Sequence, residues 1–463
     1  MRGRAGRTVG AAALAIVAAC GALVPAPSPP EPEAALPPLV IPPGEVAAVP
    51  PRPAADSLRE DERVPSPRPR VERSAVADDA PPRVRVALRT AANRVQVGAE
   101  GAVRFVDADG RYVAGGEGRV WTIESRPGAL RLVGDGGAAS AWRTGTIEAV
   151  AGGAAPLRVD GRRYRGRLRL VPTDSGLAVV NMLGLEAYLR GVVPREIGPR
   201  TAAEAAAVEA QAIAARSYTV VRLRETSGRP WDVVGTVLNQ AYGGVDAETP
   251  VADDAVAATA GLVLLYDGKV INATFHAACG GRTATAPELW RTRGEPWLVS
   301  VDDTDPATGR PYCERSPRFR WTARYTADQL QTLATRWLAQ YGGAPTGGLG
   351  RVHGVRIAGR TPTGRVASVA FTTDRGTYTV RANDVRFVLR SANGELLNST
   401  SFDVAGPDGS GGIELNGHGH GHGVGMCQWG AIGRARAGQD ARTILRTYFP
   451  GTTIGAAPAA RGP

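Results

Sequence analysis

The stretch LGLEAYLRGVVPREIGPRTAAEAAAVEAQAIAARSY, residues 183–218, organises the chain because it joins a glutamate between backbone-restricting residues to a long alanine-rich segment. Glu196 follows Pro194 by two residues and precedes the pair Gly198 and Pro199. Residues of this kind favour turns, so we expect Glu196 on a fixed corner of the backbone. A fixed carboxyl group suits acid/base chemistry; the alternative is an acid that only favours a helix terminus.

The second half of this stretch predicts a helix with its own start signal. Thr201 and Glu204 have the T-x-x-E spacing of a capping box, and the alanines that follow allow close packing. Gln211, Arg216 and Tyr218 are the polar exceptions on this helix. Arg216 could contact a substrate or form a structural ion pair, and the sequence leaves both roles open.

Composition favours an anionic partner. The chain has 463 residues and a formal net charge of +11, carried almost entirely by arginine, since Lys269 is the single lysine. No basic run with interleaved aromatic residues occurs, so we expect no nucleic-acid partner. Acidic cell-wall polymers and membrane surfaces fit the charge equally well.

The N-terminus has the pattern of an export signal. Three arginines precede an apolar run from Val9 to Ala19 that is too short to span a membrane. The run ends in Val-Ala-Ala-Cys-Gly, which is similar to a bacterial lipoprotein cleavage box. We therefore expect residues 1–20 to be a lipoprotein-type signal peptide, with Cys20 acylated and anchoring the protein to the membrane. Ordinary cleavage a few residues further on is the alternative.

The rest of the chain predicts an α+β fold. Residues 21–80 are rich in proline and alanine and predict a disordered tether. Residues 83–182 alternate apolar and polar positions between Gly-containing turns, which predicts a β-rich N-terminal unit. Residues 183–455 mix helical and strand patterns, and we expect them to form a mixed α/β catalytic core.

Three local patterns predict further elements of this core. Thr249 and Pro250 predict the start of a helix. The pair Asp267-Gly268 predicts the turn of a hairpin. Thr326 and Gln329 stand in capping-box spacing and predict a third helix that ends at Gly342-Gly343.

Several ordered blocks together resemble one known family, the SpoIID/LytB family of stage II sporulation protein D-like proteins. The resemblance runs from about residue 85 to about residue 455. Its blocks are YLRGVVPREI, EAQAIAARSY, NQAYGG, ATAGLVLLYDGKVINATFHAACGG, Trp290, GHGVGMCQWGA and ILRTYFPGT. Blocks in this order are more specific than any one motif.

The resemblance implies a lytic transglycosylase that acts on peptidoglycan glycan strands stripped of their stem peptides. In such an enzyme one glutamic acid protonates the glycosidic oxygen, and the sugar's own 6-hydroxyl replaces water as the attacking group. The family's acid matches Glu196, and no cofactor is required. The preference for stripped strands implies an N-acetylmuramoyl amidase acting beforehand in the cell envelope. The alternative is a non-catalytic, glycan-binding enhancer of such an amidase.

The resemblance also implies which polar residues contact substrate. They are Gln211, Arg216, Tyr218, Gln240, Tyr242, His422 and Gln428. We expect Glu186, ten residues before Glu196, to be a solvated helix acid. His418 and His420 alternate with glycine before His422, so a zinc hydrolase built on all three histidines is an alternative.

The cysteines allow two interpretations. If Cys20 is acylated, an odd number of cysteines remains, namely Cys279, Cys313 and Cys427. We prefer a disulfide between Cys279 and Cys313 with one spare thiol. The alternative is a structural zinc held by the three thiolates and His276, whose H-x-x-C spacing to Cys279 suits a metal.

Overall fold

The computed structural model describes residues 82–236, 240–290, 292–346, 348–391, 393–405 and 411–457. The expected signal peptide, Cys20 and the expected tether lie outside the described residues. Within the described residues, no helix is long and apolar enough to cross a membrane.

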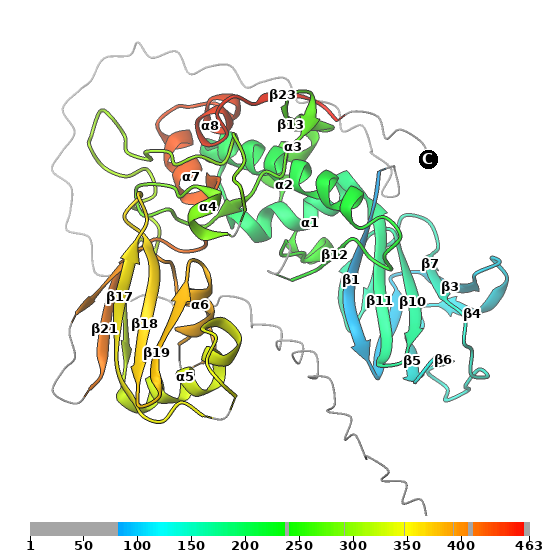
Figure 1. Cartoon of the computed structure of the whole chain (residues 1–463). Helices are drawn as coiled ribbons and strands as arrows, with labels where there is room; N and C mark the ends of the chain where they lie inside the picture. Colours follow the sequence, from blue (N-terminus) through cyan, green and yellow to red (C-terminus); the bar gives the residue numbers. More distant parts are fainter. Residues whose placement is uncertain are drawn as a thin grey trace, which may run out of the picture. The chain divides into compact units, whose positions relative to one another are not determined.

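The described chain has the mixed α+β fold that its sequence predicted, and its N-terminal part consists of two antiparallel-rich sheets (Figure 1). The first sheet has the order β12-β1-β11-β10-β7-β3-β4, and the second has the order β6-β5-β2-β8-β9. Their strands are β1 (Arg83–Ala92), β2 (Arg94–Ala99), β3 (Ala102–Asp107), β4 (Tyr112–Glu117), β5 (Trp121–Arg126), β6 (Ala129–Val133), β7 (Ile147–Ala151), β8 (Leu157–Val159), β9 (Arg162–Tyr164), β10 (Arg167–Thr173), β11 (Gly176–Gly184) and β12 (Val233–Val234).

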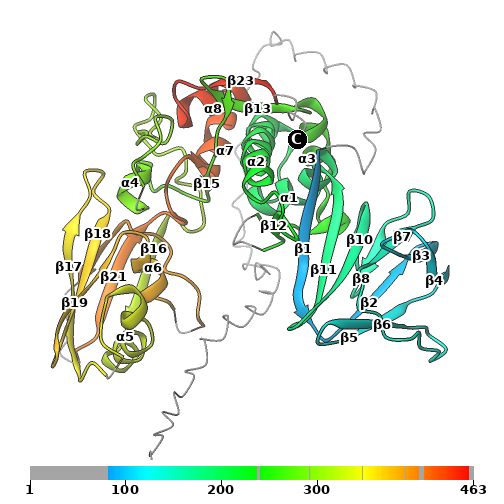
Figure 2. The ribbon, with the colours of Figure 1, turned by 45° about the vertical axis from the view of Figure 1, so that its right-hand side comes forward.

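Helices follow directly after β11, whose nine residues are all buried (Figure 2). The expected boundary near residue 182 therefore lies where a strand leads into a helix without a linker. The division into a β-rich unit, residues 83–182, and a mixed α/β core, residues 183–455, stays a prediction. The helices are α1 (Leu185–Ile197), η1 (Ala202–Glu204), α2 (Ala205–Glu225), η2 (Gly244–Ala247), α3 (Pro250–Ala258), α4 (Ala286–Leu289), α5 (Ala327–Tyr341), α6 (Asp384–Val388), α7 (Gln428–Arg436) and α8 (Ala441–Tyr448).

Four smaller sheets complete the described chain, with the orders β14-β13-β23, β15-β22, β16-β21-β20 and β17-β18-β19. Their strands are β13 (Leu262–Tyr266), β14 (Lys269–Val270), β15 (Phe275–His276), β16 (Arg320–Tyr325), β17 (Val352–Arg360), β18 (Val366–Thr373), β19 (Gly376–Arg381), β20 (Phe402–Ala405), β21 (Ile413–His418), β22 (Met426–Cys427) and β23 (Thr453–Ala456). Strands β16 to β21, with α5 and α6, enclose a hydrophobic core of their own.

The local start and turn signals are confirmed. Thr249 caps α3 through its side chain, and the 267–268 pair separates β13 from β14. Thr326 and Gln329 form the capping box of α5. The box formed by Thr201 and Glu204 is also present, although it caps a short 3-10 turn that leads into α2.

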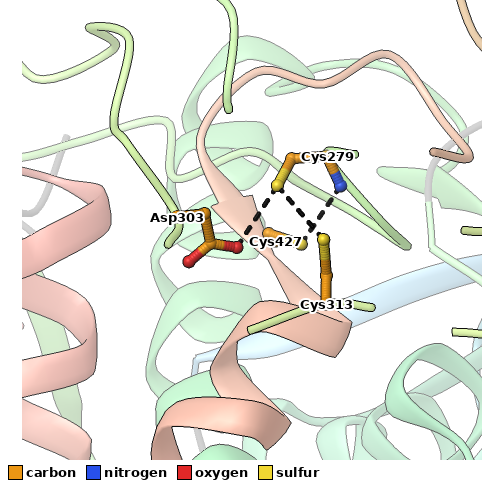
Figure 3. A group of neighbouring side chains, drawn as sticks. All are labelled: Cys279, Asp303, Cys313 and Cys427. Atoms are coloured by element: carbon orange, nitrogen blue, oxygen red, sulfur yellow. Dashed lines mark hydrogen bonds between the residues drawn. The ribbon is translucent and has the colours of Figure 1, made fainter. Parts of the chain in front are cut away.

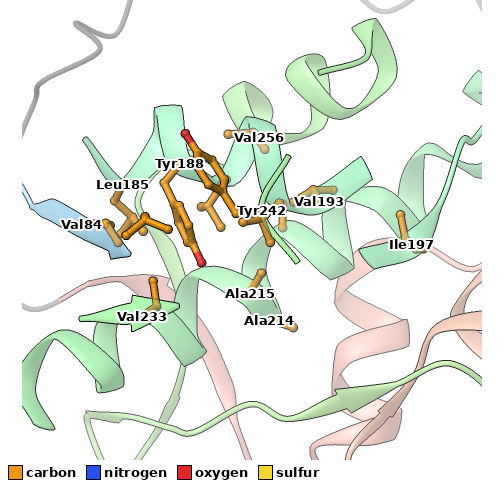
Figure 4. Packing of buried hydrophobic residues seen from close by; sticks show 14 of the residues in the cluster. Val84, Leu185, Tyr188, Val193, Ile197, Ala214, Ala215, Val233, Tyr242 and Val256 are labelled. Atoms are coloured by element: carbon orange, nitrogen blue, oxygen red, sulfur yellow. The ribbon is translucent and has the colours of Figure 1, made fainter. Parts of the chain in front are cut away.

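Helix α1 packs closely against the alanine-rich helix α2 (Figure 4). Ala214 and Ala215 are fully buried, and their small side chains let the helices approach. Tyr188 and Tyr242 pack their rings 5.2 Å apart in the same core. Gly191 allows this contact, because a Cβ at this position would lie 2.6 Å from the Tyr242 ring. The alanines of α2 thus allow α1 to pack close to it.

A buried ion pair joins α1 to α2. The guanidinium of Arg216 donates two hydrogen bonds to the carboxylate of Glu186, at 2.8 and 2.7 Å. The Arg216 side chain is 0% exposed and that of Glu186 is 18% exposed. Arg216 also donates to the carbonyl oxygens of Leu262 and Val256, so its charge is fully satisfied inside the fold. Glu186 is therefore an ion-paired residue and not the solvated acid that its sequence suggested.

We expect Glu186→Gln to destabilise the fold by about 3 kcal/mol, because it leaves the Arg216 charge buried without its counter-charge. The matched control is Glu225→Gln, which removes a partner of Arg222 from a pair whose side chains are 49% and 33% exposed. That exposed pair should contribute about 0.5 kcal/mol or less. Urea unfolding of the two variants measures the difference, and equal effects would contradict the structural role of the 186–216 pair.

Candidate active site

Glu196 lies in the last turn of α1, and not on the turn that its neighbours suggested. The helix continues through Pro194 and ends at Gly198, whose φ of 76° stops it. Proline here removes one internal hydrogen bond but does not end the helix, because the buried face of α1 packs against the core on both sides of it. Glu196 is still held rigidly, but by a packed helix terminus.

The carboxyl group of Glu196 is partly buried and is bound by amide groups. Its Oε1 accepts a hydrogen bond of 2.6 Å from the backbone N–H of Ala241. The side-chain amide of Gln428 also hydrogen-bonds to it. Within the described residues Glu196 forms no ion pair, and its hydrogen-bond partners there are amides.

Burial raises the pKa of Glu196 from 4.5 to about 7. The hydrogen bonds from Ala241 and Gln428, and the charge of Arg195, oppose this shift without cancelling it. The position at the C-terminal end of a helix acts in the same direction as burial, because the helix dipole disfavours a negative charge there. A carboxyl group with this pKa can both donate and accept a proton near neutral pH.

One predicted residue, Gln428, hydrogen-bonds to Glu196 and links it to a second, Gln211. Gln428, the first residue of α7, also donates from Nε2 to Oε1 of Gln211 on α2, at 3.3 Å. The Nε2 of Gln211 is buried and has no hydrogen-bond partner. The structure therefore brings Glu196, Gln211 and Gln428 together from segments more than 200 residues apart in the sequence.

Two further predicted residues remain partly exposed. Tyr218 and His422 are each half-buried as whole residues. Besides burial, the charges of Glu196 and of Tyr218 both raise the pKa of the Tyr188 hydroxyl. Tyr218 and Glu196 therefore both lie within electrostatic range of the Tyr188 hydroxyl.

Three predicted substrate residues are structural instead. Arg216 is fully buried in its pair with Glu186. Gln240 is fully buried, and its Oε1 accepts from Thr219 Oγ1 and from the Tyr188 hydroxyl. Tyr242 donates its hydroxyl to Asn181 at 2.8 Å inside the core. Because their polar atoms are satisfied within the fold, we correct the prediction that these three side chains contact substrate.

The three alternating histidines do not form a metal site. His418 accepts from Arg320 at 2.9 Å, and His420 accepts from Arg318 at 3.4 Å. His422 packs its ring 5.1 Å from that of Trp290. Burial, followed by nearby arginines, lowers the pKa of all three rings, to about 3 for the latter two. They are therefore neutral near pH 7 and have separate partners.

The cysteines gather in one buried cluster, but without the preferred disulfide (Figure 3). The Sγ atoms of Cys279 and Cys313 are 3.5 Å apart, well beyond the S–S bond length of about 2.05 Å. Cys427 lies beside them, and the fourth member of the cluster is the carboxylate of Asp303. The ligand atoms of these four residues lie within 4.8 Å of one another, an arrangement compatible with a metal ion.

The H-x-x-C spacing predicted His276 as the fourth ligand, but His276 does not belong to this cluster. Its Nδ1 donates to the carbonyl oxygen of Val424 at 3.2 Å, and its buried Nε2 has no hydrogen-bond partner. Strand β15, which ends at His276, pairs with β22 and so holds the ring next to His422, at 5.5 Å. Pairing of the backbone directs His276 away from the thiols.

Three members of these sites carry little signal of their own in the sequence. The N–H of Ala241 is a backbone group, which only its place in the NQAYGG block indicates. Tyr188 stands in the YLRGVVPREI block among apolar core residues. Asp303 is ten residues from Cys313 but far in sequence from the other two thiols, so its nearness to Cys313 is the one signal available.

A surface hollow of about 990 Å³ lies elsewhere, near the start of α4 and the turn after β17. Its lining residues include Arg282, Glu288, Ser300, Arg360 and Thr363, and none of the predicted site residues.

The fold and the site together define an α+β protein that holds a glutamate of raised pKa at the end of a helix. Comparison with known proteins gives the family. The SpoIID profile, described as stage II sporulation protein, matches residues 173–266, which include Glu196 and Tyr218. The chain belongs to the SpoIID family.

Three relatives illustrate this membership. Stage II sporulation protein D of Bacillus subtilis is 30% identical over 60% of this chain and 77% of its own length. An uncharacterized protein of Brachyspira hyodysenteriae is 31% identical over 64% of this chain and 73% of its own length. The amidase enhancer of Bacillus subtilis is 27% identical over 58% of this chain, which spans only 40% of that relative. Residues 311–425 match a domain of unknown function (DUF8618).

The raised pKa of Glu196 predicts a pH-dependent stability difference. The folded state holds this proton up to about pH 7, whereas the unfolded chain releases it near 4.5. The folded state therefore loses stability as pH rises from about 4.5 to about 7, and the penalty is complete above pH 7. Glu196→Gln removes that penalty. We expect the variant to be more stable than the wild type by on the order of 2 kcal/mol at pH 8 and equally stable near pH 4. Urea unfolding at both pH values measures this.

The exposed variant Glu225→Gln is the control and should shift stability little at either pH. A difference between wild type and Glu196→Gln that is the same at pH 4 and pH 8 would show that the carboxyl group is not perturbed by burial.

Proposed function

We propose that this chain is an exported lytic transglycosylase that cleaves the glycan strands of peptidoglycan and leaves 1,6-anhydro-muramic ends. The observation that supports it most is the state of Glu196: a partly buried carboxyl group with a pKa of about 7, bound by amides and placed on a rigid helix terminus. Membership of the SpoIID family supports the substrate class.

The reaction uses Glu196 twice. The protonated carboxyl group donates its proton to the glycosidic oxygen as the bond from C1 to that oxygen breaks. The 6-hydroxyl of the same muramic residue then forms the new bond to C1, and its proton passes to the Glu196 carboxylate. The acid is restored and no water is consumed, so the second carboxylate of an ordinary glycosidase is unnecessary.

The residues around Glu196 fit both stages. The N–H of Ala241 and the amide of Gln428 stabilise the carboxylate after it has given up its proton. Burial favours the protonated form before that step. The opposing effects hold the pKa near neutral pH, where an acid that must later act as a base works best.

We assign glycan contact to the side chains of Tyr218 and His422, two residues that are each half-buried. An aromatic ring offers an apolar face to a sugar, and the position of Tyr218 near Tyr188 and Glu196 would place that sugar next to the acid. The catalytic step takes no metal, and we assign any zinc bound by the cysteine cluster to structure.

The second candidate is a glycan-binding enhancer of an N-acetylmuramoyl amidase. The relative named amidase enhancer favours it. A protein of this kind would need the binding surface but not the proton on Glu196. Its partner would be the amidase that removes stem peptides, and both candidates place the chain in the cell envelope, held there by Cys20 if that residue is acylated.

Glu196→Gln separates the two candidates. We expect purified, peptide-free glycan strands to yield anhydro-muramic ends with the wild type, and at least about 100-fold fewer with the variant, because the general acid is gone. Mass spectrometry of the products measures this, with the exposed variant Glu225→Gln as the active control. Identical products from the wild type and Glu196→Gln would remove Glu196 as the catalyst. Strand binding without products from either protein would favour the enhancer.

The pH profile tests the acid directly. We expect kcat/KM to fall tenfold per pH unit above about pH 7, as Glu196 loses its proton. Gln428→Leu removes a hydrogen bond that lowers the pKa of Glu196. The fall of kcat/KM at alkaline pH should therefore move to higher pH, independently of any change in the maximal rate. An alkaline limb at the same pH in both proteins would contradict this arrangement.

A further inference from the structure

We propose that Cys279, Asp303, Cys313 and Cys427 bind one structural zinc ion. The inference goes beyond the proposed function, whose chemistry needs no metal. All four side chains are buried, and their ligand atoms lie within 4.8 Å of one another (Figure 3). They come from three separate segments: the loop after β15, the loop that holds residues 303 and 313, and the end of β22.

The spacing of the ligand atoms fits a tetrahedral ion. The Sγ of Cys279 is 3.5 Å from the Sγ of Cys313 and 3.2 Å from Oδ2 of Asp303. With Zn–S bonds of about 2.3 Å and a Zn–O bond of about 2.1 Å, tetrahedral geometry separates ligand atoms by about 3.6–3.8 Å. The cluster therefore needs shifts of about 1 Å or less to surround an ion.

Backbone N–H groups already point at the sulfur atoms. Cys427 Sγ accepts from the N–H of Cys279 and from that of Gly430, both at 3.2 Å. Cys279 Sγ accepts from the N–H of Gly281 at 3.3 Å. Donors of this kind stabilise negative charge on sulfur, which is the state that a metal ligand requires.

Asp303 is oriented as a ligand by its own neighbours. Its Oδ1 accepts from the Tyr448 hydroxyl at 2.7 Å and from Nε of Arg434 at 3.1 Å. The other oxygen, Oδ2, is left facing the sulfur atoms. Hydrogen bonds to the non-ligating atom of a ligand are the usual way in which a protein fixes that ligand.

The chemistry of this donor set selects the metal. Three thiolates exclude calcium and magnesium, which take oxygen ligands, while one carboxylate suits zinc better than the softer copper(I). A disulfide between Cys279 and Cys313 would leave the third thiol unused and would hold Asp303 only by its bonds to Tyr448 and Arg434. The ion accounts for all four residues.

The site has a consequence for the candidate active site. Cys427 is followed directly by Gln428, which binds Glu196 and Gln211. An ion at the cluster would tie the start of α7 to two loops and so hold Gln428 in place. Arg365 also joins this region, because it donates to the carbonyl oxygen of Cys279 at 2.7 Å.

The test uses the full chain carrying Cys20→Ser, so that three cysteines remain, purified without chelator. We expect one zinc per chain by elemental mass spectrometry and three reactive thiols after denaturation without reductant. A chain with no stoichiometric metal, or with one reactive thiol, would overturn the proposal, since the second result is that of a disulfide.

Variants locate the ion. Cobalt(II) in place of zinc should give sulfur-to-metal charge-transfer absorption of three-thiolate intensity, reduced by about one third in Cys427→Ser. If Cys427→Ser does not fold, Tyr448→Phe keeps all four ligands and should weaken zinc binding about 10- to 100-fold in competition with a chromophoric chelator. Unchanged affinity in Tyr448→Phe would contradict the assigned role of Asp303.

Glu196→Gln is the control that separates this inference from the proposed function. It should keep one zinc per chain, because Glu196 is not part of the cluster. Loss of zinc in this variant would contradict the location of the ion, whatever the variant does to glycan strands.

Discussion

Close packing of α1 against the alanine-rich α2 is the constraint on which the rest of the site depends. Small residues on α2 and Gly191 on α1 let the helices and the Tyr242 ring approach, and the buried pair of Arg216 and Glu186 fixes their register. Helix α1 follows directly from a fully buried strand, and its own buried residues continue as far as Ile197. Both ends of the helix are therefore held by the core. Glu196 occupies the C-terminal end, so its position is set by the core.

Two glutamates on α1 show how surroundings decide the state of a carboxyl group. Glu186 accepts two hydrogen bonds from a buried guanidinium, that of Arg216. Glu196 faces backbone and side-chain amides, which stabilise charge less than a cation does, and burial then raises its pKa to about 7. The same helix therefore carries an ion-paired glutamate and a glutamate whose pKa lies near neutral pH.

The candidate active site and the cysteine cluster are linked through the start of α7. Cys427 and Gln428 are neighbours in sequence, and their side chains belong to the cluster and to the glutamate site respectively. The same short segment therefore carries structural and functional constraints. A displacement of α7 would separate Gln428 from both Glu196 and Gln211. A cluster that holds the start of α7 therefore also protects these two contacts.

The sequence by itself determined the fold class, the local start and turn signals and the family, because these depend on short-range patterns and ordered blocks. It also singled out Glu196, whose chemical role stays a prediction. Only the tertiary structure decided that this residue ends a helix instead of occupying a turn, that Arg216, Gln240 and Tyr242 are internal, and that Asp303 replaces His276 beside the thiols. Those outcomes depend on which polar atoms meet when distant segments pack, and residue type and spacing along the chain do not encode that.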